Sequence, residues 1–176
     1  MKVLGLDISS SKIGIALIED DKKILISEVI KLKSNQTLEQ RALIFERRMK
    51  EIERHHVPFL IYIEQPAMMF KGGRTTAYTM ATLQRFNGMC SYIVYKVFDH
   101  IPTMVNPRSA RAKLGIKTPR KVPSSQVKKC IIEHVEKMFE GDFKYELTHK
   151  GNPRPGTDDR ADAIVVAIAG PMLDDV

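Results

Sequence analysis

Apolar and polar residues alternate in three segments at the start of the chain, which predicts strands over residues 2–8, 13–19 and 24–32. The segments are separated by serines at 9–11 and by a charged run at 19–23. Because both breaks are short, the pattern predicts an antiparallel meander of three strands.

The spacing of apolar residues becomes helical after residue 37. Intervals of four, three, four and three predict an amphipathic helix that begins near Thr37 and is closed by Pro58. A fourth strand is predicted to end at Glu64, and a long helix is predicted over residues 75–98. A fifth, short strand is predicted over residues 101–105.

Prolines and glycines divide the last third of the chain. Three prolines between residues 107 and 123 interrupt a basic segment, and Ser124 or Ser125 is expected to cap a helix that runs toward Phe139. The proline- and glycine-rich segment 151–156 is expected to form a loop before a final, mostly buried helix.

The composition is that of an ordinary globular protein. The chain of 176 residues has the usual size of one domain, so we expect a single domain over residues 1–176. No apolar run approaches the ~18 residues of a membrane span and no secretory signal is visible, so we expect a soluble, cytoplasmic protein without a membrane partner. Cys90 and Cys130 are expected to be reduced and buried rather than zinc ligands.

Positive charge is concentrated in one segment. The chain carries a net charge of +7 with a sequence pI near 9.4, and residues 104–129 contain eight basic residues and no acidic residue. A phosphate backbone is the natural partner of such a segment, and a solvated basic surface is the structural alternative.

Acidic residues end or open apolar segments at four places. Asp7 and Glu64 each end a strand-like run, while Asp159 and Asp162 lie three apart where the final helix opens and so share a helix face. A carboxylate beside a core is costly unless a cation or hydrogen bonds compensate it, so the pattern suggests a divalent-metal nuclease. The alternatives are a capped serine turn for Asp7, an ion pair for Glu64, and a favourable helix N-terminus for Asp158 or Asp159.

The chemistry of phosphodiester hydrolysis explains why such a site would be acidic. The reaction needs a nucleophilic water and charge stabilisation at the leaving oxygen, and two metal ions about 3.5–4 Å apart supply both. Carboxylate ligands suit Mg²⁺, with Mn²⁺ as a substitute, and argue against zinc. We therefore expect a metal-dependent site with two Mg²⁺ ions.

The element order resembles that of the ribonuclease H-like fold, an α/β fold with a mixed five-stranded sheet flanked by helices. The segments Leu4–Ser9, Glu64–Gln65 with Phe70–Lys71, and Asp159–Ala169 resemble, in order, the motifs of RuvC-type Holliday-junction resolvases. The resemblance covers nearly the whole chain and implies a dimeric, metal-dependent endonuclease that cuts four-way DNA junctions symmetrically in DNA recombination and repair. The loop at 151–156 and the basic segment suggest a viral or phage relative, whose location would be the host cytoplasm.

The resemblance also implies roles for individual residues. Asp159 is preferred to Asp158 as a ligand because the family spacing between the last two acids is three. A lysine contributes to the site in relatives, and Lys121 is assigned to that role. The implied metal ligands are Asp7, Glu64, Asp159 and Asp162.

Two segments are expected to hold the DNA. In the loop after Glu64 an aromatic side chain would stack on an unpaired base while two cations hold phosphates, with packing of this loop onto the domain as the alternative. The basic segment would neutralise further phosphates. The expected DNA-binding residues are Phe70, Lys71, Arg74, Arg108, Arg111, Lys113, Lys117 and Lys121.

The helix predicted over residues 75–98 has more apolar residues than packing on one sheet uses. We therefore expect a homodimer joined through this helix, which would place two sites at a fixed separation. Complete burial inside the monomer is the alternative. The apolar residues are Tyr78, Met80, Leu83, Phe86, Met89, Ile93 and Val97.

Other classes of protein share parts of these patterns. The segment Gly5–Gly14 also resembles the first phosphate motif of actin-like and sugar-kinase ATPases, but such ATPases need two lobes around a nucleotide and this chain is too short for both. A nuclease of the same fold acting on RNA:DNA hybrids, and a nucleic-acid-binding module with structural acids, are further alternatives.

Overall fold

The computed structural model describes residues 1–66, 76–119 and 122–174. Most strands and helices predicted from the sequence are confirmed to within a residue or two at their ends. None of the helices in these ranges combines the length and apolar character needed to cross a membrane. The elements are β1 (Lys2–Ile8), β2 (Lys12–Glu19), β3 (Lys23–Lys31), α1 (Leu38–His55), β4 (Leu60–Glu64), α2 (Ala77–Phe98), β5 (Thr103–Val105), α3 (Pro107–Lys113), α4 (Ser124–Met138) and α5 (Thr157–Asp174).

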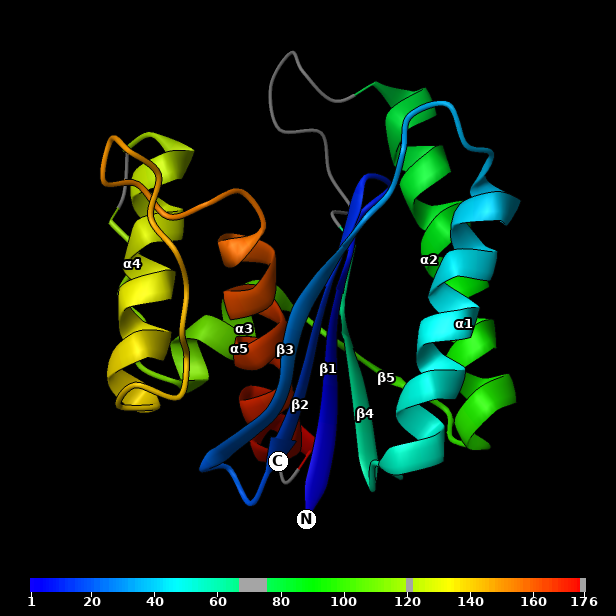
Figure 1. Cartoon of the computed structure of the whole chain (residues 1–176), viewed down its shortest axis with the longest axis horizontal. Coiled ribbons are helices and arrows are strands. Elements are labelled where there is room, and N and C mark those ends of the chain that lie inside the picture. The colour runs from blue at the N-terminus through cyan, green and yellow to red at the C-terminus, as the bar shows by residue number, and fades with distance from the viewer. Residues whose placement is uncertain (67–75, 120–121, 175–176) are drawn as a thin grey trace.

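The strands form one mixed sheet of five strands in the order β3-β2-β1-β4-β5 (Figure 1). The first three strands make the predicted antiparallel meander. β4 pairs with β1, and β5 pairs with β4, in the parallel direction. The α/β architecture expected from the sequence, a mixed five-stranded sheet flanked by helices, is therefore confirmed.

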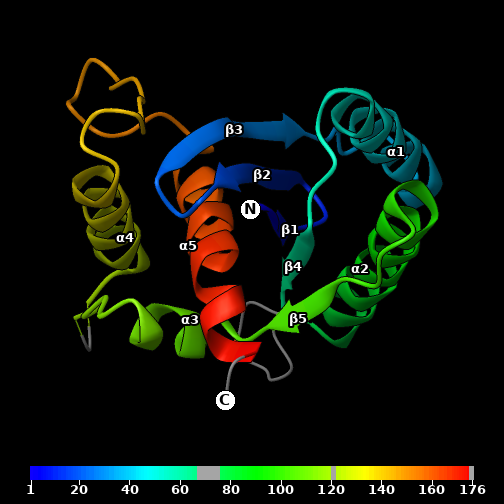
Figure 2. The same ribbon diagram turned by 90° about the horizontal axis from the view of Figure 1, so that it is seen from below.

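Helices cover both faces of this sheet. In Figure 2, α1 and α2 lie on one side of the strands, and α5 lies on the other with α3 and α4 beside it. Successive side chains of a strand point to opposite faces. Leu4 and Leu6 of β1 accordingly pack in the core with α1 and α2, whereas Val3 packs in the core with α5. Asp7 has the same parity as Val3 and therefore lies on the α5 face.

The ends of three helices show how well local sequence predicts structure. α1 begins as predicted, because Thr37 and Gln40 form a reciprocal capping box. The expected serine cap of α4 is wrong, because Pro123 precedes the helix and no side chain caps it. The short helix α3 was not predicted. Pro107 occupies its first position, where a missing N–H costs nothing, and the Asn106 side chain accepts from two backbone amides.

Two glycines allow the backbone of α5 to lie directly against the sheet. A Cβ atom added to Gly5 would lie 2.2 Å from the carbonyl oxygen of Ala163, and one added to Gly14 would lie 2.0 Å from the carbonyl oxygen of Asp159. Any larger residue would push the helix away. The first turns of α5 are thus fixed against β1 and β2.

Both cysteines are free thiols. Cys90 is buried in the core with α1 and α2, and burial raises the pKa of its thiol to about 12. Cys130 is half-buried, so the expected burial is confirmed only for Cys90.

Candidate active site

Asp7 and Glu64 end two neighbouring parallel strands. The register of β1 and β4 pairs Leu6 with Ile63, so the next residue of each strand is one of the two acids. Tyr62 packs in the core with α5, and Glu64, two residues later, has the same parity. Both carboxylates therefore lie at the same edge of the sheet and on the face that α5 covers.

The first turn of α5 adds the acids that are distant in sequence. Gly14 pairs with Asp7 across β1 and β2, and the carbonyl of Asp159 lies against Gly14. Asp162 follows three residues later, on the same side of the helix. The Asp159 and Asp162 side chains are 15% and 14% exposed, so the acids lie in a largely dry setting.

The pKa of Asp7 responds to burial and to the charges of the neighbouring acids. Burial raises the pKa of its carboxyl well above the ordinary value, and the negative charge of Glu64 and then those of Asp162, Asp159 and Asp158 raise it further. The structure therefore brings the four predicted acids together, with Asp158 beside them.

Basic side chains from other elements pair with the acids of α5. Lys12, the first residue of β2, donates from Nζ to Oδ2 of Asp159 at 3.0 Å. Arg111 of α3 donates from Nη2 to Oδ1 of Asp162 at 2.9 Å. Burial raises the pKa of Asp162, the charge and hydrogen bond of Arg111 oppose this, and the net shift is upward.

A third pair involves Asp158. Lys128 of α4 donates from Nζ to Oδ2 of Asp158. Burial raises the pKa of Asp158, but the hydrogen bond and charge of Lys128, followed by the charge of Lys12, outweigh burial and lower it. The pKa of Lys128 is raised in turn, mainly by this hydrogen bond. The pairing with Lys128 thus favours the ionised form of Asp158.

The carboxylate oxygens of the cluster are the ligand type that a hard divalent cation prefers. Within the described ranges, no three histidine, cysteine, aspartate or glutamate side chains converge closely enough to hold a metal ion. Lys12 and Arg111 engage carboxylate oxygens of Asp159 and Asp162 that such an ion would need. Each ion pair leaves the second carboxylate oxygen of its aspartate available to another partner.

The expected DNA-binding residues fall into three groups. Arg108, Lys113 and Lys117 are exposed on and just after α3. Arg111 turns inward to Asp162, where it meets a carboxylate rather than solvent. The remaining four, Phe70, Lys71, Arg74 and Lys121, lie outside the described residues.

Sequence reasoning missed Lys12 and did not select Lys128. The only local signal for Lys12 is its place at the start of β2, directly after the serine turn that follows Asp7. Lys128 belongs to the basic segment, where its sequence neighbours do not distinguish it. Both are identified by their partners on α5, 147 and 30 residues away in the chain.

No protein-family model matches the sequence, and no curated protein matches it. Similarity appears among solved structures. RuvC from Thermus thermophilus is 18% identical with a TM-score of 0.68, over 99% of this chain and 96% of that chain. The same protein in complex with a Holliday junction substrate is 16% identical with a TM-score of 0.66, over 99% and 95%.

A eukaryotic structure shows the same similarity. The yeast mitochondrial Holliday junction resolvase Ydc2 is 17% identical with a TM-score of 0.58, over 95% of this chain and 76% of that chain. The chain thus shares its fold with RuvC and Ydc2, which agrees with the fold expected from its motifs. At these identities the similarity establishes the fold.

Proposed function

We propose that the protein is a metal-dependent endonuclease that resolves four-way (Holliday) junctions and other branched DNA by phosphodiester hydrolysis. The observation that carries this proposal is the placement of Asp7 and Glu64 side by side at one sheet edge, beneath the turns of α5 that hold Asp159 and Asp162. The fold supports it, because one of its structural neighbours was solved with a Holliday junction substrate.

The acids would hold two Mg²⁺ ions, for which Mn²⁺ substitutes. When bound, such ions supply an activated water and neutralise charge on the leaving oxygen. The chain itself contributes positioning: Gly14 fixes Asp159 over Asp7, and burial excludes most water from the carboxylates. Before metal binds, Arg111 favours the ionised form of Asp162, and Lys12 forms an ion pair with Asp159.

The basic side chains would position the DNA backbone. α3 packs against α5 and its Arg111 bonds to Asp162, so the exposed Arg108 and Lys113 lie on a helix that borders the acid cluster, and Lys117 follows shortly after α3. Contacts of this kind fix the position of a nucleic acid without reading its sequence. Lys121, and the aromatic and basic loop after Glu64, are retained as proposed contacts from sequence alone.

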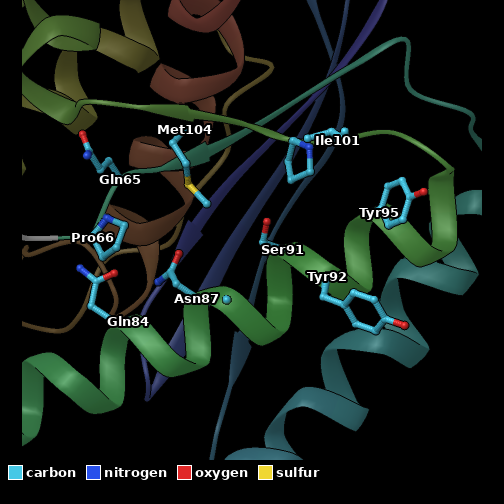
Figure 3. Close-up of a pocket in the computed structure, with 11 residues that line it drawn as sticks. Gln65, Pro66, Gln84, Asn87, Ser91, Tyr92, Tyr95, Ile101 and Met104 are labelled. Atoms are coloured by element: carbon cyan, nitrogen blue, oxygen red, sulfur yellow. The ribbon is translucent and has the colours of Figure 1, made fainter.

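We also propose that two copies associate through α2 and the edge strand β5. A cavity of about 620 Å³ lies between these elements. Figure 3 shows Tyr92 and Tyr95 of α2 near Ile101 at one end of this cavity, and Gln65 and Asn87 at the other. The two tyrosines are 64% and 45% exposed and Ile101 is 76% exposed, so this end of the cavity offers apolar surface to a partner.

The apolar surface of α2 differs from the one expected. Phe86 and Ile93 are buried inside the monomer, and Met89 and Val97 pack against the same core. Of the apolar residues named from the sequence, Tyr78 is the one that is largely exposed, at 82%. The proposed dimer surface is therefore the face of α2 that carries Tyr92 and Tyr95. Sedimentation at micromolar concentration should give twice the 20.0 kDa chain mass.

A cleavage assay tests the activity. The protein is incubated with a synthetic four-way junction, a linear duplex of the same sequence and an RNA:DNA hybrid, each with Mg²⁺ or with EDTA. The expected result is Mg²⁺-dependent paired nicks at symmetric positions of the junction, with little cutting of the duplex. Preferred cutting of the hybrid would favour the RNA:DNA alternative, and cleavage undiminished by EDTA would contradict metal dependence.

A further inference from the structure

A second cavity, of about 580 Å³, adjoins the acid cluster on the side of α4. It is formed where the N-terminal part of α4 meets the start of β2 and the loop that leads into α5. Figure 1 shows this loop passing beside α4 on its way to α5. The charged residues lining it are Lys12, Lys128, Lys129, Arg154 and Asp158. Four cations and one anion give this basic cavity a strongly positive lining.

The basic cavity already contains one anion, the carboxylate of Asp158. Its side chain is only 16% exposed and accepts a hydrogen bond from Lys128. Lys12, which binds the neighbouring Asp159, also lines the cavity. The cations at the cavity wall are thus already paired with carboxylate oxygens of the protein.

The other two cations are free to turn toward a ligand. Lys129 lies 3.8 Å from Glu133, and its side chain is 67% exposed. Arg154 pairs with Glu146 at 3.0 Å, and both of these side chains are more than half exposed. Ion pairs at this exposure contribute little, so an incoming anion can replace them.

We propose that the basic cavity binds a phosphate group of the nucleic-acid backbone, and that Asp158 occupies the position of this phosphate until the nucleic acid displaces it. This inference rests on the proposed function, since it names a subsite for the same substrate. Lys12 links the cavity to Asp159, so the bound phosphate belongs to the strand close to the point of cleavage. Several cations around one small space suit a phosphate, which offers more acceptor oxygens than the carboxylate it replaces.

The proposal gives Asp158 a role different from that of a metal ligand. As an internal competitor it lowers the affinity of the free protein for nucleic acid. Removing its charge should therefore tighten binding, whereas removing Lys128 should weaken it.

The test uses equilibrium binding of a fluorescent four-way junction in EDTA, measured over a range of salt concentrations. Asp158→Asn should bind more tightly and steepen the slope of log affinity against log salt by about 0.9, the value for one additional phosphate contact. Lys128→Gln should weaken binding and flatten the slope by about the same amount. Asp142→Asn and Lys137→Gln, near the far end of α4, make the same charge changes away from the cavity and should leave the slope unchanged.

Several outcomes would overturn the subsite. It is refuted if Asp158→Asn and Asp142→Asn change the slope equally, because only net charge would then matter. It is also refuted if Asp158→Asn gains affinity for inorganic pyrophosphate, read from thermal unfolding, without any gain for the junction, because the ligand would then be a small phosphate compound. Thermal unfolding of each variant also shows whether it is folded. The wild-type cleavage assay is independent: a wild type that cuts junctions while these variants bind unchanged disproves the subsite alone.

Discussion

The two faces of the sheet use charge differently. On the α1 and α2 side, the core is built from large apolar side chains and the ion pairs link the surfaces of the elements, including Glu46, which is 14% exposed between Lys50 and Lys96. Arg48 pairs there with Glu28, and their side chains are 30% and 34% exposed. On the α5 side, Lys12 and Arg111 pair with acids that are 15% and 14% exposed.

Exposed ion pairs and ion pairs with largely buried carboxylates differ in what they contribute to stability. An exposed pair gains little because water screens it. A concealed carboxylate pays a desolvation cost and persists only with a compensating partner. The same sheet carries both arrangements, so the strand pattern alone does not decide which face gathers the acids. The second face owes its character to the small residues and acids of α5.

The largest expected effect comes from Asp7, at the centre of the concealed acids. Asp7→Asn should reduce junction cleavage by more than about 100-fold, the loss typical when one preorganised charge-stabilising group is removed. Junction binding in EDTA should be retained, because the basic surface supports affinity. The measurements are a cleavage time course and a binding isotherm. Glu64→Gln and Asp162→Asn should lose cleavage in the same way as Asp7→Asn. Full activity of Asp7→Asn would show that Asp7 does not belong to the site.

The same substitution should stabilise the metal-free protein at neutral pH. The pKa of Asp7 is raised in the folded state above its ordinary value near ~3.9, so above that pH the folded protein binds more protons than the unfolded chain. Its contribution to stability is therefore present at low pH and lost as pH rises through the folded pKa. The free energy of unfolding of Asp7→Asn, minus that of the wild type, should increase between pH 4.5 and pH 8 in urea titrations with EDTA. A pH-independent difference would contradict the burial of an ionisable group.

The two neighbouring acids at the start of α5 should differ in their effect on cleavage. Asp159→Asn should be as damaging as Asp7→Asn, because Asp159 lies over Asp7 on the backbone contact with Gly14. Asp158→Asn should be much milder, since Asp158 is held by Lys128 in the basic cavity. Cleavage rates at saturating Mg²⁺ give the ranking. The reverse order would move the metal ligand by one residue.

Two glycine substitutions compare the packing on the two faces of the sheet, one at the contact of α5 with β1 and one in α2. Gly5→Ala should destabilise the protein by about 1–3 kcal/mol, because the added Cβ atom would lie on the backbone of α5. Gly88 lies in α2, where a Cβ atom would meet nothing within 4 Å. Gly88→Ala should therefore stabilise by roughly 0.5–1 kcal/mol through helix propensity. Urea unfolding monitored by circular dichroism measures both, and equal effects would mean that α5 does not touch the sheet as closely as described.

The smallest effect is expected at the exposed ion pair. Glu28→Gln should change the free energy of unfolding by about 1 kcal/mol or less, and less still in high salt. Junction cleavage should not change, because Glu28 lies on β3, two strands away from β1. A loss of cleavage in this variant would show that the two faces are coupled in a way that their contacts do not reveal.

The fold was largely predictable because its elements have strong local patterns. Alternation specified the strands, and the Thr37 capping box specified the start of α1. The helix α3 escaped prediction because it has only seven residues and begins with Pro107, which was interpreted as a break. At α4 the serines are the typical caps, but the helix simply follows Pro123 without one.

The site was predictable only in part. Asp7 and Glu64 end their strands, so their position at one edge follows from strand direction. The pairing of Lys12 with Asp159 depends on how α5 crosses β2, and no local pattern contains that information. Arg111 resembles its basic neighbours in sequence, yet packing turns it toward Asp162 while they face solvent. The acids can therefore be recognised in the sequence, whereas their basic partners are set by the tertiary structure.

The close contact between α5 and the first two strands has a consequence for the order of synthesis. β1 and β2 leave the ribosome early, whereas α5 begins about 150 residues after Asp7. N-terminal segments can fold while the chain is still being made. The acids of β1 and β4 are therefore separated from those of α5 until α5 has been translated. A growing chain that still lacks α5 cannot assemble the complete set of acids. If this cluster cuts DNA, the nascent polypeptide therefore cannot do so.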